Sequence, residues 1–158
     1  MTSRDIKILI PGCGNAYEAE YLYAKGFKNT FILEIAQGAI DSFIKRVPEF
    51  PTENIIHNNF FDIHGQYDLI IEQTFFCAIN PELREQYVEQ MTKLLKPNGK
   101  LVGLLFNTDF AGGPPFGGNK DEYVKRFENS FHIDVMSDSF NSIGPRQQKE
   151  LFIILRNK

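Results

Sequence analysis

The residues best suited to chemistry begin with a glycine turn near the start of the chain. The apolar residues 6–10 predict a buried strand, which runs straight into Pro11-Gly12-Cys13-Gly14-Asn15. Glycines let backbone amides approach a ligand closely, and the helix expected next offers its unpaired N-terminal N–H groups to electron-rich atoms. We therefore expect a nucleotide-like ligand to lie against Gly12 and Gly14.

The ends of the next two predicted strands narrow the choice of ligand. Glu34 ends the second strand, where its carboxylate can accept hydrogen bonds from both hydroxyls of a ribose. After the third strand, Asn59 and Phe60 offer an amide and an apolar ring to an adenine. Glu34 by itself fits NAD and S-adenosylmethionine enzymes equally. A dinucleotide fingerprint places a small residue where this chain has Tyr17, which counts against the alternative of an NAD-dependent oxidoreductase.

The fourth predicted strand ends in Glu72 and Gln73, and an apolar run that includes Phe75 and Phe76 follows them. Polar residues followed by apolar ones at the centre of a cleft predict a site whose mouth binds charge and whose floor is apolar.

Strand and helix patterns alternate along the whole chain and must position these residues. The predicted strands are 6–10, 31–35, 55–57, 67–72, 101–106, 132–136 and 150–155, and the predicted helices are 15–25, 37–46, 81–95 and 119–128. Asn15 and Glu18 have the spacing of a capping box, Gly26 is expected to end the first helix, and 96–99 reads as a turn. The last two strands have no helix between them and should pair antiparallel.

This order predicts an α/β fold with a three-layer, doubly wound and mostly parallel sheet, formed as one domain over residues 1–158. The ligand is then expected outside the carboxyl ends of the strands, at the switch point beside the first one.

Composition excludes several classes of partner. The formal net charge is −3 and no run of Lys and Arg forms a basic face, so we expect no nucleic-acid partner. No apolar run approaches about 18 residues and no signal-peptide pattern is present, which predicts a cytoplasmic protein without a membrane contact.

The three histidines lack ligand-like spacing, so no metal is expected, and Cys13 and Cys77 are interpreted as reduced thiols.

The chain resembles a class I S-adenosylmethionine-dependent methyltransferase of the thiopurine S-methyltransferase family, which includes thiol and halide or thiocyanate methyltransferases. The phenylalanine pair before Cys-Ala-Ile, joined to a later Gly-Pro-Pro-Phe, is fairly specific to this family. The residues that carry the resemblance are Pro11-Gly12-Cys13-Gly14, Glu34-Ile35, Phe61-Asp62, Phe75-Phe76-Cys77-Ala78-Ile79, Leu94 to Lys100, Gly113-Pro114-Pro115-Phe116 and Arg146.

The resemblance implies S-adenosylmethionine as cofactor, S-adenosylhomocysteine as its product, and a role for each matching residue. Gly12 and Gly14 would face the cofactor, Glu34 beside Ile35 would hold its ribose, Asn59 and Phe60 would frame its adenine, and Glu72 and Gln73 would complete its site. Gln73 stands where some members have an arginine near the amino-acid end of the cofactor. The acceptor site would comprise Phe75, Phe76, Pro114, Pro115 and Phe116, with Arg146 attracting an anionic acceptor.

The reaction that the resemblance implies is displacement at the sulfonium methyl by a small soft nucleophile: a thiol, thiopurine, halide or thiocyanate. It needs little acid-base machinery, and no Ser-His-Asp or Cys-His arrangement is evident. The Pro-Pro-Phe sequence follows the fifth predicted strand and not the fourth, which argues against an amine acceptor. A module that binds S-adenosylmethionine without catalysis stays an alternative.

Relatives in the family carry several tens of residues before the first strand, which close over the cofactor, whereas this sequence has five. We therefore expect an open site with reduced affinity for S-adenosylmethionine, or a lid shared between copies of the chain. A monomer is the default expectation.

Overall fold

The computed structural model, which describes residues 3–139 and 149–158, contains a seven-stranded sheet in the order β3-β2-β1-β4-β5-β7-β6. The strands are β1 Ile8–Pro11, β2 Thr30–Glu34, β3 Ile55–His57, β4 Tyr67–Gln73, β5 Leu95–Phe106, β6 Phe131–Asp138 and β7 Glu150–Asn157. Strands β1 to β5 pair in parallel, and β7 lies antiparallel between β5 and β6. The mostly parallel sheet and its antiparallel end are confirmed.

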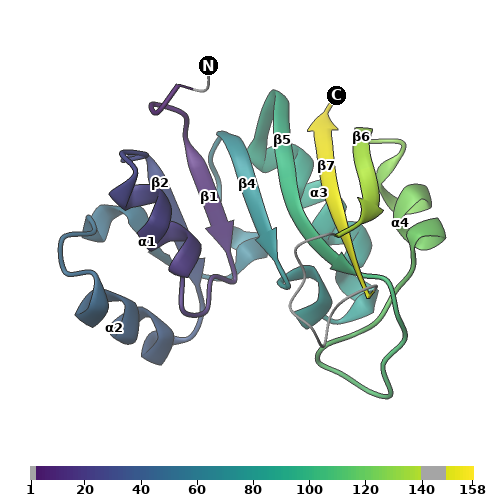
Figure 1. Cartoon of the computed structure of the whole chain (residues 1–158), viewed down its shortest axis with the longest axis horizontal. Helices are drawn as coiled ribbons and strands as arrows, with labels where there is room; N and C mark the ends of the chain where they lie inside the picture. The colour runs from purple at the N-terminus through teal and green to yellow at the C-terminus, as the bar shows by residue number, and fades with distance from the viewer. Residues whose placement is uncertain (1–2, 140–148) are drawn as a thin grey trace.

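Helices cover the sheet on two faces (Figure 1). They are α1 Tyr17–Ala24, α2 Gln37–Arg46, α3 Arg84–Leu94 and α4 Lys120–Phe127. Successive residues of β1 point to opposite faces: Ile8 and Ile10 pack in one core with α1 and α2, and Leu9 packs in the other core with α3 and α4. Burial on both faces explains why β1 is continuously apolar. The predicted three-layer α/β fold is therefore confirmed.

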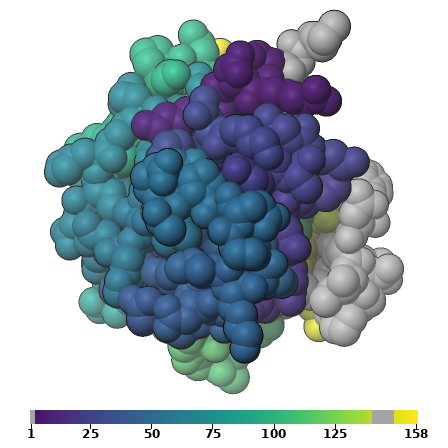
Figure 2. Space-filling model, turned by 90° about the vertical axis from the view of Figure 1, so that its left-hand side faces the viewer, coloured from purple at the N-terminus to yellow at the C-terminus, as the bar shows by residue number. Residues whose placement is uncertain are grey.

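Helices α1 and α2 cover the part of the sheet next to its β3 edge (Figure 1). Seen from this side, α1, α2 and the chain around β3 form a continuous surface, coloured indigo to blue (Figure 2). Phe43 of α2 is fully buried there and meets the Phe50 ring edge to face at 5.0 Å between ring centroids. This packing fixes the ends of β2 and β3, which carry ligand-binding candidates.

The start of α1 differs from the prediction. The helix begins at Tyr17, and its N-cap is Ala16, in the left-handed conformation with a φ of 54° and without a side-chain cap. Arg46 of α2 instead bonds to the carbonyl oxygen of Asn15 and forms an ion pair with Glu20 at 2.8 Å. The predicted capping box is wrong because a contact from another helix holds this terminus.

Two other boundaries differ from the prediction. Lys96 to Gly99, expected as a turn, lies within β5, where the register with β4 shifts and Asn98 has a φ of 64°. Pro81 opens a single 3-10 turn, η4 (Pro81–Leu83), and α3 follows it.

Within residues 3–139 and 149–158, no helix has the length and apolar character needed to cross a bilayer.

Candidate active site

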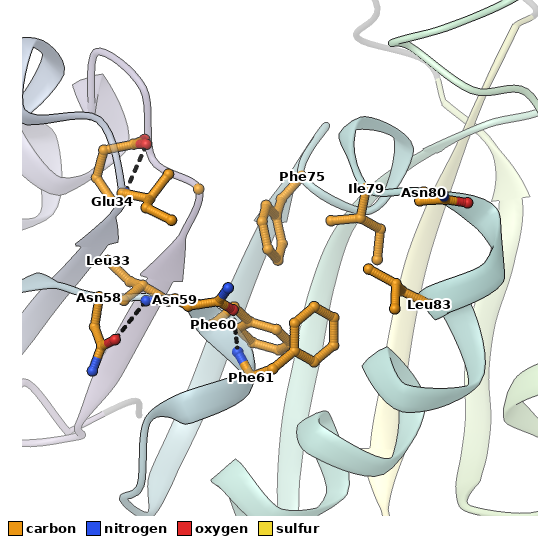
Figure 3. Close-up of a pocket in the computed structure, with 12 residues that line it drawn as sticks. Leu33, Glu34, Asn58, Asn59, Phe60, Phe61, Phe75, Ile79, Asn80 and Leu83 are labelled. Carbon is orange, nitrogen blue, oxygen red and sulfur yellow. Dashed lines mark hydrogen bonds between the residues drawn. The ribbon is translucent and has the colours of Figure 1, made fainter.

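A pocket of about 250 Å³ lies at the carboxyl ends of the first four strands, where a doubly wound sheet binds its ligands (Figure 3). Segments from β1, β2, the loop after β3 and the chain after β4 converge on it. Its lining residues are Gly12, Leu33, Glu34, Ile35, Asn58, Asn59, Phe60, Phe61, Phe75, Ile79, Asn80 and Leu83.

Glu34 is held by the backbone on both carboxylate oxygens. Oε2 accepts a hydrogen bond from the N–H of Gly14 at 2.9 Å, and Oε1 accepts from the N–H groups of Ile35 and Ala36 at 3.0 and 3.1 Å. A carboxylate has about four acceptor positions, so capacity remains for a hydroxyl. Glu34 thus ties the glycine turn to the end of β2 and still presents an acceptor to the pocket.

The residue after Glu34 presents an apolar side chain to the pocket. Ile35 is 65 % exposed although its side chain is apolar, and its carbonyl oxygen lies 3.0 Å from Nε2 of His57 at the end of β3. An exposed apolar side chain anchored at a pocket wall offers a packing surface for a flat ring.

The two glycines of the turn serve different purposes. Both have positive φ, 58° at Gly12 and 53° at Gly14. A Cβ on Gly12 would lie 2.2 Å from Cδ2 of Phe75, whereas a Cβ on Gly14 would have no neighbour within 4 Å. Gly12 is therefore needed so that the Phe75 ring can lie on the turn, and Gly14 keeps an open approach.

Gly12→Ala is expected to displace the Phe75 ring and to lower the free energy of unfolding by about 1–3 kcal/mol. Gly14→Ala, which carries only the strain of its backbone, should lower it by about 1 kcal/mol. Urea unfolding of the two variants measures the difference. Equal losses would contradict the assigned role of Phe75.

Aromatic rings form the floor of the pocket. The Phe60 ring packs edge to face on Phe61 and Phe75, with centroids 5.3 and 5.2 Å apart, and lies 5.6 Å from the Tyr87 ring below it. At the rim, Oδ1 of Asn59 accepts from the N–H of Phe61 at 2.9 Å (Figure 3). That bond leaves the NH₂ group of the Asn59 amide as a donor.

At the opposite side of the pocket lie Ile79, Asn80 and Leu83 (Figure 3). The Asn80 side-chain oxygen accepts from the N–H of Glu82 at 3.0 Å and so caps η4. The pocket therefore has a carboxylate and amides on one side, and the apolar side chains of Ile79 and Leu83 beside Asn80 on the other, which suits a ligand with a polar sugar and a flat base.

Comparison with known families decides the family. The model of the thiopurine S-methyltransferase family matches residues 2–154. The chain belongs to that family. This confirms the resemblance that the glycine turn, the phenylalanine pair and the proline loop suggested.

Named relatives agree with the family. "Probable thiol methyltransferase 2" of Arabidopsis thaliana is 32% identical over 151 residues, which cover 91% of this chain and 66% of that protein. "Thiocyanate methyltransferase 1" of Brassica oleracea is 31% identical over 118 residues, 70% of this chain and 51% of that protein. The chain thus spans between half and two thirds of the length of these plant relatives.

Solved structures share the fold. A methyltransferase structure from Methanosarcina mazei, described as S-adenosylmethionine-dependent, has a TM-score of 0.78 at 17% identity and covers 99% of this chain and 94% of that one. An N1-methyltransferase of Burkholderia thailandensis, solved with S-adenosylhomocysteine bound, has a TM-score of 0.79 at 12% identity and covers 98% of this chain and 72% of that one. The sheet is therefore that of a class I methyltransferase.

Five of the residues that were predicted to contact the cofactor line the pocket: Gly12, Glu34, Ile35, Asn59 and Phe60. Gly14 does not line the pocket, but its N–H donates a hydrogen bond to the carboxylate of Glu34, which does.

Glu72 and Gln73 do not line this pocket. The Glu72 side chain has no exposed surface, so in this structure its carboxylate is not accessible to a ligand. Gln73 borders a different cavity, together with Leu104 and Phe152. Side chains alternate along β4, so Glu72 is buried in the core and Gln73 borders the other cavity. Their contacts with the cofactor stay predictions.

The predicted acceptor residues divide into four groups. Phe75 lines the pocket, whereas Phe76 is fully buried against Tyr87 and Tyr123. Pro114 and Pro115 are exposed and, like Phe116, do not line the pocket, but the N–H of Phe116 bonds to the carbonyl oxygen of Cys77 at 2.7 Å. This bond places the proline loop beside the chain that follows β4. Arg146 lies outside the described residues.

Several lining residues escaped the sequence interpretation. Leu83 resembles a core position because its spacing continues the apolar stripe of α3, yet it belongs to η4 and faces the pocket. Ile79 follows the phenylalanine pair, and Asn80 could have been suspected as a cap because Pro81 follows it.

The surroundings of Cys13 disfavour a nucleophilic thiolate. Cys13 and Cys77 are not joined by a disulfide, and burial together with nearby Glu34 raises the pKa of Cys13 to about 12. At neutral pH the Cys13 thiol is therefore protonated. Within the described ranges, no three His, Cys, Asp or Glu side chains cluster so as to hold a metal ion.

Proposed function

We propose that this protein binds S-adenosylmethionine in the pocket and transfers its methyl group to a small soft nucleophile. Membership of the thiopurine S-methyltransferase family supports the activity. The observation that carries it is the meeting of Glu34, Ile35, Asn59 and Phe60 in one pocket at the switch point of the sheet.

The pocket residues fit the adenosine part of the cofactor. Glu34 would accept from a ribose hydroxyl with its remaining acceptor position. The exposed side chain of Ile35 and the rings of Phe60 and Phe61 would pack against the adenine, while the Asn59 amide would donate to its edge. The open face of Gly14 leaves space next to the ribose.

Bound S-adenosylmethionine supplies an electrophilic methyl group on a sulfonium. The lone pair of the nucleophile forms a bond to the methyl carbon as the carbon–sulfur bond breaks, and the electron pair of that bond stays on the sulfur of S-adenosylhomocysteine. No proton moves when the nucleophile is already an anion. The chain has to hold the nucleophile in line and exclude water, and positioning alone can supply about 7–11 kcal/mol.

The acceptor class comes from the relatives and from the character of the walls. Relatives are named thiol, thiocyanate and thiopurine methyltransferases. A thiol, thiopurine, halide or thiocyanate therefore fits best, with Phe75 and the loop carrying Pro114, Pro115 and Phe116 as the wall and Arg146 attracting the anion. The bond from Phe116 to Cys77 supports that place for the loop.

The remaining assignments are part of the same proposal. We expect a cytoplasmic monomer that acts on small molecules and has no nucleic-acid or membrane partner. The family assignment does not favour a binding module without catalysis.

Calorimetry and a methyl-transfer assay test the function together. The protein at pH 8 should bind S-adenosylhomocysteine, and with methyl-labelled S-adenosylmethionine it should label at least one member of a panel of thiols, thiopurines, iodide and thiocyanate. Binding without product for any acceptor would favour the module. Absence of binding at millimolar ligand would refute the cofactor assignment.

A further inference from the structure

A buried carboxylate lies directly beneath the pocket and takes no part in the proposed ligand contacts. Glu72, near the end of β4, has no exposed surface. Its Oε2 accepts from the N–H of Phe75 at 2.7 Å, and its Oε1 accepts from the N–H of Phe76 at 2.9 Å and from the Tyr87 hydroxyl at 2.6 Å. Glu72 thus joins the chain after β4 to helix α3.

These bonds determine where the Phe75 ring lies. Between Glu72 and Phe75 the chain turns sharply through Thr74, whose φ is 60°. The ring then lies on Gly12, close enough that a Cβ there would stand 2.2 Å from it, and it borders the pocket. Only the turn from Glu72 to Phe75 therefore separates the Glu72 carboxylate from the ring that borders the pocket.

Among residues 3–139 and 149–158, no cation bonds to the Glu72 carboxylate. Strand β5 presents Gly103, which has no side chain, and α3 presents the neutral Tyr87. The Cys77 thiol bonds to the carbonyl oxygen of Thr74, and the Tyr123 hydroxyl bonds to that of Phe106. The guanidinium of Arg84 lies over the Phe76 ring and bonds to Glu122 and to the carbonyl oxygen of Gly117.

In the described part of the chain, all three hydrogen bonds to Glu72 therefore come from neutral donors. Burial disfavours the charged form and raises the pKa of Glu72 to about 7, against the lowering effect of the three bonds. Protonation takes up one of the about four acceptor positions and removes the negative charge, so the bonds from the three donors weaken to those of a neutral acceptor.

We propose that Glu72 is a positioning residue whose ionised carboxylate holds Phe75 over Gly12, so that the pocket is formed when Glu72 is charged and loosens when it is neutral. The inference rests on the proposed function, since it deepens the account of the same site. Affinity for S-adenosylhomocysteine should therefore be full above the pKa of Glu72 and fall as the pH drops through it.

The first test uses the ligand-free protein, so that it does not depend on the identity of the ligand. The amide protons of Phe75 and Phe76 should titrate together near pH 7 in NMR spectra, because both bond to the same carboxylate. Glu72→Gln should remove this shared titration, and Glu89→Gln, an exposed position on α3, should preserve it. Amide shifts that do not change between pH 5.5 and 8.5 would overturn the proposal.

The second test follows the affinity. For the wild-type protein, S-adenosylhomocysteine should bind about tenfold more weakly at pH 5.5 than at pH 8. Glu72→Gln should bind weakly at both pH values and lose this dependence. Tyr87→Phe removes a bond that lowers the pKa of Glu72, so it should move the acid limb to higher pH.

The outcomes separate the two proposals. Identical pH profiles for wild type and Glu72→Gln would overturn the positioning role. A shift of the acid limb to lower pH in Tyr87→Phe would do the same. Failure of the wild type to bind at pH 8 would count against the proposed function, and the amide titration would then decide the role of Glu72 by itself.

Discussion

Glu34→Gln weakens the binding of S-adenosylhomocysteine by about 10- to 100-fold, which is the largest effect that we expect on ligand affinity. The carboxylate oxygens of Glu34 accept from the N–H groups of Gly14, Ile35 and Ala36. An amide replaces one acceptor with an NH₂ group, which faces these donors and cannot accept from a ribose hydroxyl. Isothermal titration calorimetry at pH 8 measures the change.

A matched control separates the loss of this contact from a general loss of charge. Glu53→Gln also removes one negative charge, at an exposed position just before β3 that does not line the pocket. It should leave the affinity unchanged within about twofold. Equal affinities for Glu34→Gln and Glu53→Gln would show that Glu34 does not contact the ligand.

Gly103→Ala lowers the free energy of unfolding by about 3 kcal/mol or more, the largest effect on stability that we expect. A Cβ at this position would lie 1.9 Å from the carbonyl oxygen of Glu72 and 2.6 Å from its Cβ. Gly103 pairs with Glu72 across β4 and β5. Since the obstructing oxygen belongs to the backbone, the two central strands have to separate.

Gly38→Ala is the control for the glycine substitution. Gly38 lies in α2, and a Cβ there would meet nothing within 4 Å. Replacing a helix glycine with alanine should raise stability by about 0.5–1 kcal/mol. Urea unfolding followed by circular dichroism compares both variants with the wild type. A Gly103→Ala protein that unfolds at the wild-type urea concentration would refute the close approach of β4 and β5.

Local sequence patterns predicted most of the architecture. The bounds of α2 and β3 agree with the prediction, and the antiparallel pairing of β6 and β7 was expected from the missing helix between them. These features depend on hydrophobic periodicity and on connection length, which are properties of the chain itself. The start of α1 was wrong because the Arg46 contact comes from another helix.

In the pocket, too, the position of a residue along its strand was predictable, whereas the direction of its side chain was not. Glu34, Asn59 and Phe60 were placed from the sequence because each lies at or just after the end of a strand, and parallel strands end at one edge of the sheet. Glu72 also lies near the end of a strand, yet its carboxylate points into the core and bonds to Tyr87. Strand position does not distinguish these two cases.

By itself, the sequence determined the order of strands and helices, the family, and the strand ends that line the pocket, because these follow from spacing along the chain. Only the tertiary structure decided which side chains at those ends reach the pocket. It buried Glu72 and Phe76, turned Gln73 to another cavity, and brought Leu83 to the pocket wall. Whether a side chain at a strand end is buried, and which way it points, depends on packing between elements that lie far apart in the chain. Local sequence patterns therefore cannot predict it.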